Sequence, residues 1–436
     1  MKVSAELLVA RLKAQLQPGI VDTDAKLLAP YVVDGLSPTV LCSPDQVEQV
    51  SVALRVCAET GATVVPWGGG TSIGLGNVPP KVDLVLDLAH LDAVIEHDDA
   101  NLTATVQAGT KVAVLQEVLG RKGQFLALDP PYPSRATVGG VVATNVNGPR
   151  RVFYGGVRDL VIGMKVVLAT GEQIKAGGKV VKNVAGYDMC KLFVGSLGTL
   201  GIITEVTFRM TPIPESAATI LGRGPLDASL QFIDQLSQSV FLPAGTALLS
   251  GEVARVAGMS SGNVPAIAIW VEGFKEPVGR HLREIQTIAE RFGLGSEILT
   301  DRPHQRLWDI VRDFASTGEG LLYRVTTPLA AIGELVNRIE SSKCPGSSAR
   351  YIAHPSSGSL WLSVDADPSG AAWFARLTGW AEEHRGHAVM VAAPPEIKNG
   401  VNVWGPPPPG ISIMRELKRQ FDPEGILNRG RFVSGL

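Results

Sequence analysis

The sequence has few cysteines and no closely spaced pair of them. Cys42, Cys57, Cys190 and Cys344 are far apart among 436 residues, and no Cys-x-x-Cys pair occurs. Iron–sulfur and zinc sites of the common kinds need closely spaced thiolates, so the chain offers no such site of its own. Scattered cysteines are typical of a protein with reduced thiols in the cytoplasm.

The sequence also lacks an excess charge of one sign and a long apolar run. Lys and Arg number 40 and Asp and Glu 42, for a net charge of −2, and no basic stripe points to nucleic acid. No apolar run reaches the roughly 18 residues that span a bilayer. Glu6, Arg11 and Lys13 interrupt the start, so we expect no signal peptide. We therefore expect a cytoplasmic protein, or one attached to a membrane through its partners.

The chain is instead rich in glycine, and three of its 48 glycines stand together after an expected strand. The segment Val64–Gly76 reads VVPWGGGTSIGLG. A loop without Cβ atoms lets a diphosphate approach the backbone, whose N–H groups can bind it as an anion nest. The segment is neither the G-x-G-x-x-G dinucleotide fingerprint nor a Walker loop. Taken alone it could be an ordinary turn.

Two further glycine clusters strengthen the cofactor interpretation. Residues 133–148 read PSRATVGGVVATNVNG, and residues 186–203 read GYDMCKLFVGSLGTLGII. The amides of Asn145 and Asn147 can hydrogen-bond a heteroaromatic ring or a ribose. Three such turns fit one large nucleotide cofactor better than three unrelated loops.

The pattern of apolar residues predicts an α+β protein with three parts. Residues 1–213 combine helices at the N-terminus, 44–60 and 111–122 with strands near 62–67, 82–88, 102–108, 161–168 and 202–210. Two prolines in TPIPE mark a boundary, after which residues 214–404 alternate strands and helices in a βαβ-like way. Residues 405–436 begin with a rigid proline run and continue as a helix.

These segments resemble a known flavoprotein family. PWGGGTSIGLG, PSRATVGG, VVKNVAGYDMCKLFVGSLGTLGIITEV and the closing FDPEGILNRGR are similar to the FAD-binding domain of the vanillyl-alcohol oxidase / p-cresol methylhydroxylase family. Within it, VVKNVAGYD most resembles the FAD-binding E subunit of bacterial glycolate oxidase. The resemblance implies a two-subdomain FAD-binding (PCMH-type) domain over residues 1–213. It also implies a cap domain over 214–404, and a C-terminal segment, 405–436, that returns to the FAD domain.

The family also implies which residues bind FAD. The loop from Pro66 to Ser72 is expected at the pyrophosphate, the second cluster at the flavin, and the third at the adenine or ribose end. The cofactor-binding residues predicted in this way are Pro66, Trp67, Gly68, Gly69, Gly70, Thr71, Ser72, Pro130, Ala136, Thr137, Gly139, Gly140, Asn145, Gly148, Gly201, Ile203 and Asn428. Lys182 is a candidate to place a positive charge near the flavin, or a surface lysine.

Two departures from the family qualify these expectations. Covalent members often carry a His directly after the cradle glycines, where this chain has Thr71, so we expect non-covalent FAD. Catalytic 2-hydroxy-acid dehydrogenases of the family carry a metal motif of the type H-x-G-D-G-N-x-H. The nearest segment here, HPSSGSLW, has the single His354. We therefore expect no metal, and no catalytic base can be named.

The resemblance leaves three functions open. The chain could be a subunit that oxidises a small 2-hydroxy acid such as glycolate, beside a paralogous flavin subunit and an iron–sulfur subunit. It could be a non-catalytic flavin-binding or assembly subunit, which the incomplete metal motif favours. It could also be a stand-alone FAD-linked oxidase of a sugar, lactone or alcohol.

Overall fold

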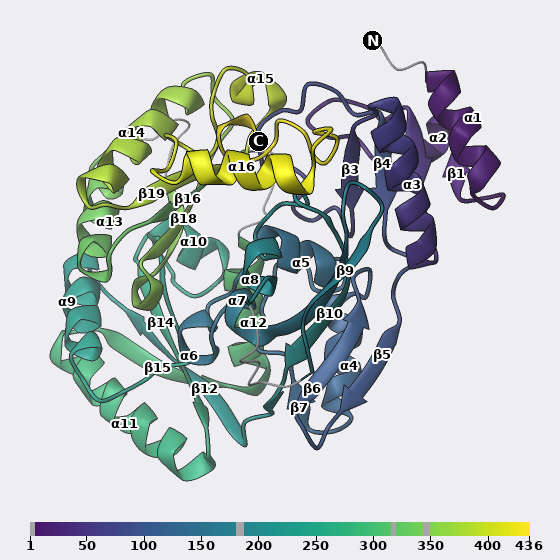
Figure 1. Cartoon of the computed structure of the whole chain (residues 1–436). Helices are drawn as coiled ribbons and strands as arrows, with labels where there is room; N and C mark the ends of the chain where they lie inside the picture. The colour runs from purple at the N-terminus through teal and green to yellow at the C-terminus, as the bar shows by residue number, and fades with distance from the viewer. Residues whose placement is uncertain (1–4, 180–186, 315–319, 343–348) are drawn as a thin grey trace.

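Figure 1 shows the computed structural model, which describes residues 5–179, 187–314, 320–342 and 349–436. The chain mixes helices and sheets, as the sequence predicts. Among the described residues, no helix is both long and apolar enough to cross a membrane. Lys182 and most of the VVKNVAGYD segment lie outside the described residues.

The first layer is a small sheet in which three parallel strands lie beside N-terminal helices. Its order is β1-β2-β4-β3, and β2, β4 and β3 run parallel. The elements are α1 (Ala5–Gln15), β1 (Val21–Asp22), α2 (Ala25–Leu28), β2 (Val40–Cys42), α3 (Val47–Thr60), β3 (Val64–Trp67) and β4 (Leu84–Asp87). Gly61 ends α3 with a φ of 69°, as predicted from its place after the apolar pattern. The sheet delivers the end of β3 to the glycine cradle.

A second, antiparallel sheet packs beside the first, in the order β5-β6-β10-β8-β9. Its strands are β5 (Val94–Asp98), β6 (Thr103–Gln107), β8 (Val161–Val167), β9 (Gln173–Gly177) and β10 (Ile202–Arg209). Short helices and one strand pair accompany it: α4 (Val112–Gly120), β7 (Gln124–Phe125), α5 (Val138–Thr144), α6 (Arg151–Tyr154), α7 (Val157–Leu160), α8 (Cys190–Phe193) and β11 (Thr211–Pro212). Its core brings α5, which carries the second glycine cluster, against β6 and β10.

The third layer is an eight-stranded sheet in the order β15-β12-β14-β13-β17-β18-β16-β19. Every neighbouring pair is antiparallel, so the βαβ-like alternation read from the sequence does not give parallel pairs. The strands are β12 (Ser216–Arg223), β13 (Gly245–Leu249), β14 (Ala266–Gly273), β15 (Gly295–Thr300), β16 (Leu321–Thr326), β17 (Arg350–His354), β18 (Ser359–Val364) and β19 (His387–Ala392).

One face of this sheet is covered by long amphipathic helices. They line the outer left side of the molecule in Figure 1 and bury the larger apolar cluster of the chain. These helices are α9 (Leu226–Ser237), α11 (Lys275–Arg291), α13 (Ile332–Glu340) and α14 (Gly370–Glu383). The other face carries a second apolar cluster with α10 (Gly251–Val256) and α12 (Asp301–Asp313). This second face looks toward the glycine-rich layers.

The C-terminal segment crosses back to the glycine-rich layers. After α15 (Pro395–Lys398), α16 (Ile411–Phe421) lies against the third glycine cluster, where the Phe421 and Phe193 rings are 5.7 Å apart. Leu427 then forms a parallel bridge with Val64 of β3. The C-terminal segment therefore returns to the strand that leads into the cradle.

Candidate active site

The cradle is a stretch of backbone whose donors are unused. In the described part of the chain, none of the N–H groups from Gly68 to Ser72 donates a hydrogen bond to protein. Polar backbone groups that are partly enclosed need partners, so this row of N–H groups suits an anionic ligand. The loop thus has the donor set that a diphosphate requires.

The cradle glycines are also required by a contact between two loops. A Cβ on Gly68 would lie 2.2 Å from Thr137 Oγ1, and one on Gly69 would lie 1.8 Å from the Arg135 carbonyl oxygen. The sequence suggested only that glycine lets a ligand approach. The structure shows that glycine first lets the second cluster pack against the first.

The third cluster joins the other two in the same way. Gly198 has a φ of 68°, and a Cβ there would meet Pro66 at 2.6 Å. Asn428, with a φ of 43°, donates from its side chain to the Leu197 carbonyl at 2.6 Å and from its backbone to Val64 at 2.8 Å. Three distant segments therefore enclose one space.

That space is a cavity with about 780 Å³ of empty volume, its open mouth included. Most of the predicted cofactor residues line it: Pro66, Trp67, Gly68, Gly69, Gly70, Thr71, Ser72, Thr137, Gly139, Gly140, Gly201, Ile203 and Asn428. The lining is largely glycine, small hydroxyl residues and apolar side chains. It therefore combines a backbone anion site with room for a flat ring.

Four predicted residues do not line this cavity. Pro130 and Ala136 are buried beside it. Asn145 ends α5 in the left-handed conformation, and its side-chain oxygen accepts a hydrogen bond from Asn147. Gly148 lines a neighbouring cavity instead. A Cβ at this position would lie 2.3 Å from the Cβ of Asp129.

A buried cation that the sequence did not predict lines the cavity. Arg431 is 1% exposed, and its guanidinium donates to the Ile73 and Leu75 carbonyls. Burial lowers the pKa of Arg431 to about 10, and the nearby Asp34 carboxylate, 3.8 Å away, opposes that shift. Arg431 ends the FDPEGILNRGR segment. Its place in a segment that resembles a cofactor-binding segment of the family could have suggested this role.

Lys398 completes the same cluster from another segment. Its Nζ donates to the Gly74 carbonyl at 2.9 Å and to Asp34 Oδ1 at 2.5 Å, with a side chain that is fully buried. Three consecutive carbonyls, from Ile73 to Leu75, are therefore held by two cations. Two cations beside the single Asp34 carboxylate leave a net positive charge next to the cavity, which favours an anionic cofactor.

A second cavity opens directly from the first and shares Gly70, Thr71, Ser72 and Thr144 with it. It lies between the cradle and the inner face of the eight-stranded sheet. Its charged or polar lining residues are Asp129, Tyr132, Arg135, Asn147, Arg312, Arg324 and His354. A group bound in the first cavity would therefore face a polar space of a different character.

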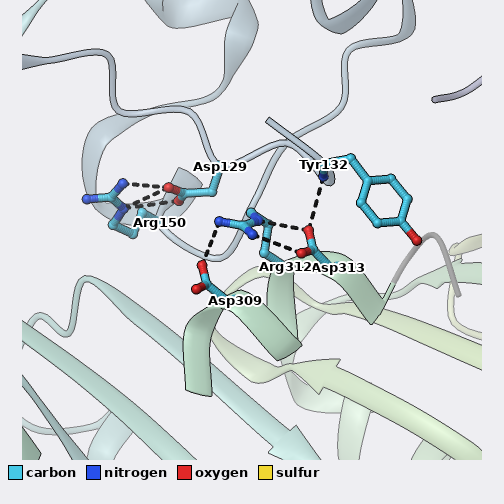
Figure 2. Close-up of polar contacts among 6 residues, drawn as sticks. All are labelled: Asp129, Tyr132, Arg150, Asp309, Arg312 and Asp313. Carbon is cyan, nitrogen blue, oxygen red and sulfur yellow. Dashed lines mark hydrogen bonds and ion pairs between the residues drawn. The ribbon is translucent and has the colours of Figure 1, made fainter. Parts of the chain in front are cut away.

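Ion pairs and one hydrogen bond between segments lie in the wall of the second cavity (Figure 2). Arg150 binds Asp129 in a bidentate pair, with its Nε 3.0 Å from Oδ2. On α12, Arg312 pairs with Asp309 at 2.7 Å and Asp313 at 2.8 Å. Asp313 also accepts the backbone N–H of Tyr132 at 3.0 Å. The hydrogen bond from Tyr132 to Asp313 joins α12 to the loop before the second glycine cluster.

His354 lies in the wall of the second cavity as a neutral side chain. Its Nδ1 donates to the Thr246 carbonyl at 2.9 Å, and burial lowers its pKa. Nε2 is then the unprotonated nitrogen, and no hydrogen bond to it occurs among the described residues. The arrangement is that of an available proton acceptor.

A metal ion does not fit here. Trp361 stands where the metal motif has its second His, and Ser357 where it has its Asp. Within the described ranges, no group of three or more His, Cys, Asp or Glu side chains could hold a metal ion. His384 and His387 do not form a metal-ligand pair either, because His384 ends α14 and pairs with Glu334 at 3.2 Å.

Two segments of the chain match known families of FAD-dependent proteins. Residues 38–177 match the FAD binding domain family, and residues 406–432 match the C-terminal domain of FAD linked oxidases. The chain is 30% identical to glycolate oxidase subunit GlcD of Bacillus subtilis (strain 168), over 91% of this chain and 89% of that protein. It is 28% identical to glycolate oxidase subunit GlcE of Escherichia coli (strain K12), over 86% and 93%.

Among solved structures, p-cresol methylhydroxylase with substrate bound has a TM-score of 0.72 at 17% identity, over 97% of this chain and 96% of that one. This likeness shows the fold. The unused N–H row, the glycine contacts and the buried cations fit an FAD diphosphate in the first cavity. The chain therefore has the fold of p-cresol methylhydroxylase, belongs to the FAD-linked oxidase family that includes glycolate oxidase subunit GlcD, and is an FAD-dependent oxidoreductase.

Proposed function

We propose that this chain is an FAD-binding subunit of a glycolate-oxidase-type complex that oxidises a small 2-hydroxy acid to the 2-oxo acid. The observation that carries the proposal is the continuity of two cavities of different character, one built to hold an anionic cofactor and one polar. The similarity to both glycolate oxidase subunits supports the substrate class.

Each cavity has its own task in this proposal. The N–H groups of Gly68 to Ser72 bind the FAD diphosphate, and Arg431 keeps the cradle in shape. Bound FAD supplies the two-electron acceptor. The polar cavity holds and orients the substrate beside it. FAD is held without a covalent bond, because Thr71 follows the cradle glycines where covalent members often carry His.

The division of the chain follows from these tasks. Residues 1–213 hold FAD, residues 214–404 form the cap that encloses the substrate, and residues 405–436 close the cofactor site. A paralogous flavin subunit and an iron–sulfur subunit are the partners in this proposal, and the iron–sulfur subunit receives the electrons. The complex is cytoplasmic or reaches the membrane through these partners.

A second candidate is a flavin-binding subunit that does not turn over substrate. Trp361 and Ser357, in place of the metal-binding His and Asp, favour it. The test is to purify the chain alone and with its co-purifying proteins, and to assay glycolate and D-lactate with an artificial electron acceptor. Turnover by the chain alone supports the first candidate. Bound flavin with turnover only after partners are added supports the second, and absence of flavin contradicts both.

A further inference from the structure

Arg324, Trp361 and His354 share the inner face of the eight-stranded sheet. Arg324 of β16 pairs with Trp361 of β18, and Trp361 pairs in turn with Ile352 of β17. Directly opposite residues point to the same face, and so do residues two apart on one strand. His354 therefore faces the same side as Arg324 and Trp361, and all three line the second cavity.

Arg324 brings an uncompensated positive charge to that cavity. Its guanidinium lies over the Trp361 ring, 5.7 Å from the ring centre. Among the described residues it has no carboxylate partner and no hydrogen bond, whereas Arg312 and Asp129 are neutralised by Asp313 and Arg150. A partly enclosed guanidinium offers a fork of N–H donors that matches a carboxylate.

The guanidinium of Arg324 also lies at the position where the chain departs from the metal motif. Trp361, the residue that replaces the second metal-binding His, is the one over which the guanidinium lies. The loss of a metal ligand and the presence of a fixed organic cation therefore occur at one place. In members with the metal motif a metal ion would bring positive charge to the substrate cavity, whereas in this chain Arg324 brings it.

We propose that Arg324 binds the carboxylate of the substrate in a metal-free site and that His354 Nε2 accepts the proton of its hydroxyl group. This inference rests on the proposed function. Oxidation of a 2-hydroxy acid to a 2-oxo acid releases two electrons and two protons. Bound FAD would supply the acceptor for the hydride equivalent, which carries both electrons and the C–H proton, and the imidazole of His354 takes the O–H proton.

The geometry also fixes the specificity of the site. A neutral alcohol, sugar or lactone leaves the guanidinium of Arg324 without a partner in a partly enclosed space, which is unfavourable. A monocarboxylate pairs with it. Arg324 therefore selects a 2-hydroxy acid over the neutral substrates.

The binding test uses oxamate, a 2-oxo acid analogue that cannot be oxidised, and the FAD-loaded protein dialysed against EDTA and then against buffer. Calorimetric titration is expected to show binding, and Arg324→Met is expected to weaken it by about 10- to 100-fold. Arg350→Met is the matched control. Arg350 lies on the same face of the sheet as Arg324, on β17, which is separated from β16 by β18. It is outside the cavity, so its variant should bind oxamate as the wild type does.

The results separate the inference from the function on which it rests. A protein that binds no FAD contradicts the proposed function. A yellow protein that binds oxamate only after Zn²⁺ or Mn²⁺ is restored overturns the metal-free site. Equal oxamate affinities in Arg324→Met and Arg350→Met, at equal FAD content, overturn the assignment of Arg324.

The role of His354 is tested by separating binding from proton transfer. His354→Gln should bind oxamate within a few fold of wild type, because the carboxylate is held by Arg324. Its rate of flavin reduction by glycolate or D-lactate should fall by about 10²–10⁴-fold, the usual contribution of a positioned base. A variant that keeps FAD and oxamate binding and reduces flavin at the wild-type rate refutes this role.

Discussion

Gly69→Ala gives the sharpest test of the cradle, because the structure fixes what the added methyl group meets. Its Cβ would lie 1.8 Å from the Arg135 carbonyl oxygen, and ordinary contacts begin at 3.4 Å. The second loop must therefore move by about 1.6 Å, the difference between the two values. Overpacking of this kind typically costs about 1–3 kcal/mol.

That cost should appear mainly in cofactor binding. We expect the second loop of the flavin-free variant to move away from position 69, and closure of both loops around FAD to restore the clash. A cost of about 1–3 kcal/mol corresponds to a dissociation constant for FAD raised by about 5- to 150-fold. Titrating the flavin-free protein with FAD and following the quenching of flavin fluorescence measures it.

Gly74→Ala is the matched control in the same loop. A Cβ at Gly74 meets no atom within 4 Å, and its φ is not in the left-handed region. We therefore expect this variant to bind FAD with nearly wild-type affinity. Equal FAD affinities in Gly69→Ala and Gly74→Ala would refute the conclusion that contact between the two loops shapes the site.

Three further predictions follow from the cofactor site and the buried charges. Acid or heat should release the flavin into the supernatant, and flavin absorbance retained in the precipitated protein would contradict non-covalent binding. Lys398→Met should lower the free energy of unfolding by about 3–5 kcal/mol in urea titrations, because it leaves the Asp34 carboxylate buried without its main partner, whereas Lys398→Met with Asp34→Asn should recover part of the loss. Burial, with a smaller effect of Arg150, lowers the pKa of His304 to about 4. Between about pH 6.5 and 4 only the unfolded state binds this proton, so the free energy of unfolding is highest above pH 6.5 and falls by up to about 3 kcal/mol on acidification. In His304→Gln, the free energy of unfolding should fall less steeply across that pH range.

Local elements of the fold could be predicted because their signals are local. The apolar spacing before Gly61 predicts the helix that the structure places at Val47–Thr60, and the β-branched run before the cradle predicts β3. The pairing of the eight-stranded sheet could not be predicted in this way. It depends on which strands lie beside one another, and alternation of strands and helices is compatible with both parallel and antiparallel pairs.

The site shows the same limit. The resemblance brings Gly68, Gly139 and Gly201 to one cavity because their short motifs are recognisable in the sequence. Arg324 and Lys398 have no motif. Their roles depend on contacts across the sheet and between distant segments, such as the pairing of Arg324 with Trp361. Residues of this kind are found only when the register and the packing are known.

Anaerobic reduction of the bound flavin shows whether this site oxidises a 2-hydroxy acid without a metal ion. The FAD-loaded, EDTA-treated chain, alone and with its co-purifying proteins, is mixed with glycolate or D-lactate while the visible flavin absorbance is followed. We expect one of these acids to bleach the flavin without added metal, and Arg324→Met to be reduced about 10- to 100-fold more slowly at the same subsaturating concentration. A flavin that dithionite bleaches but that neither acid reduces, with or without the partners, would contradict this expectation.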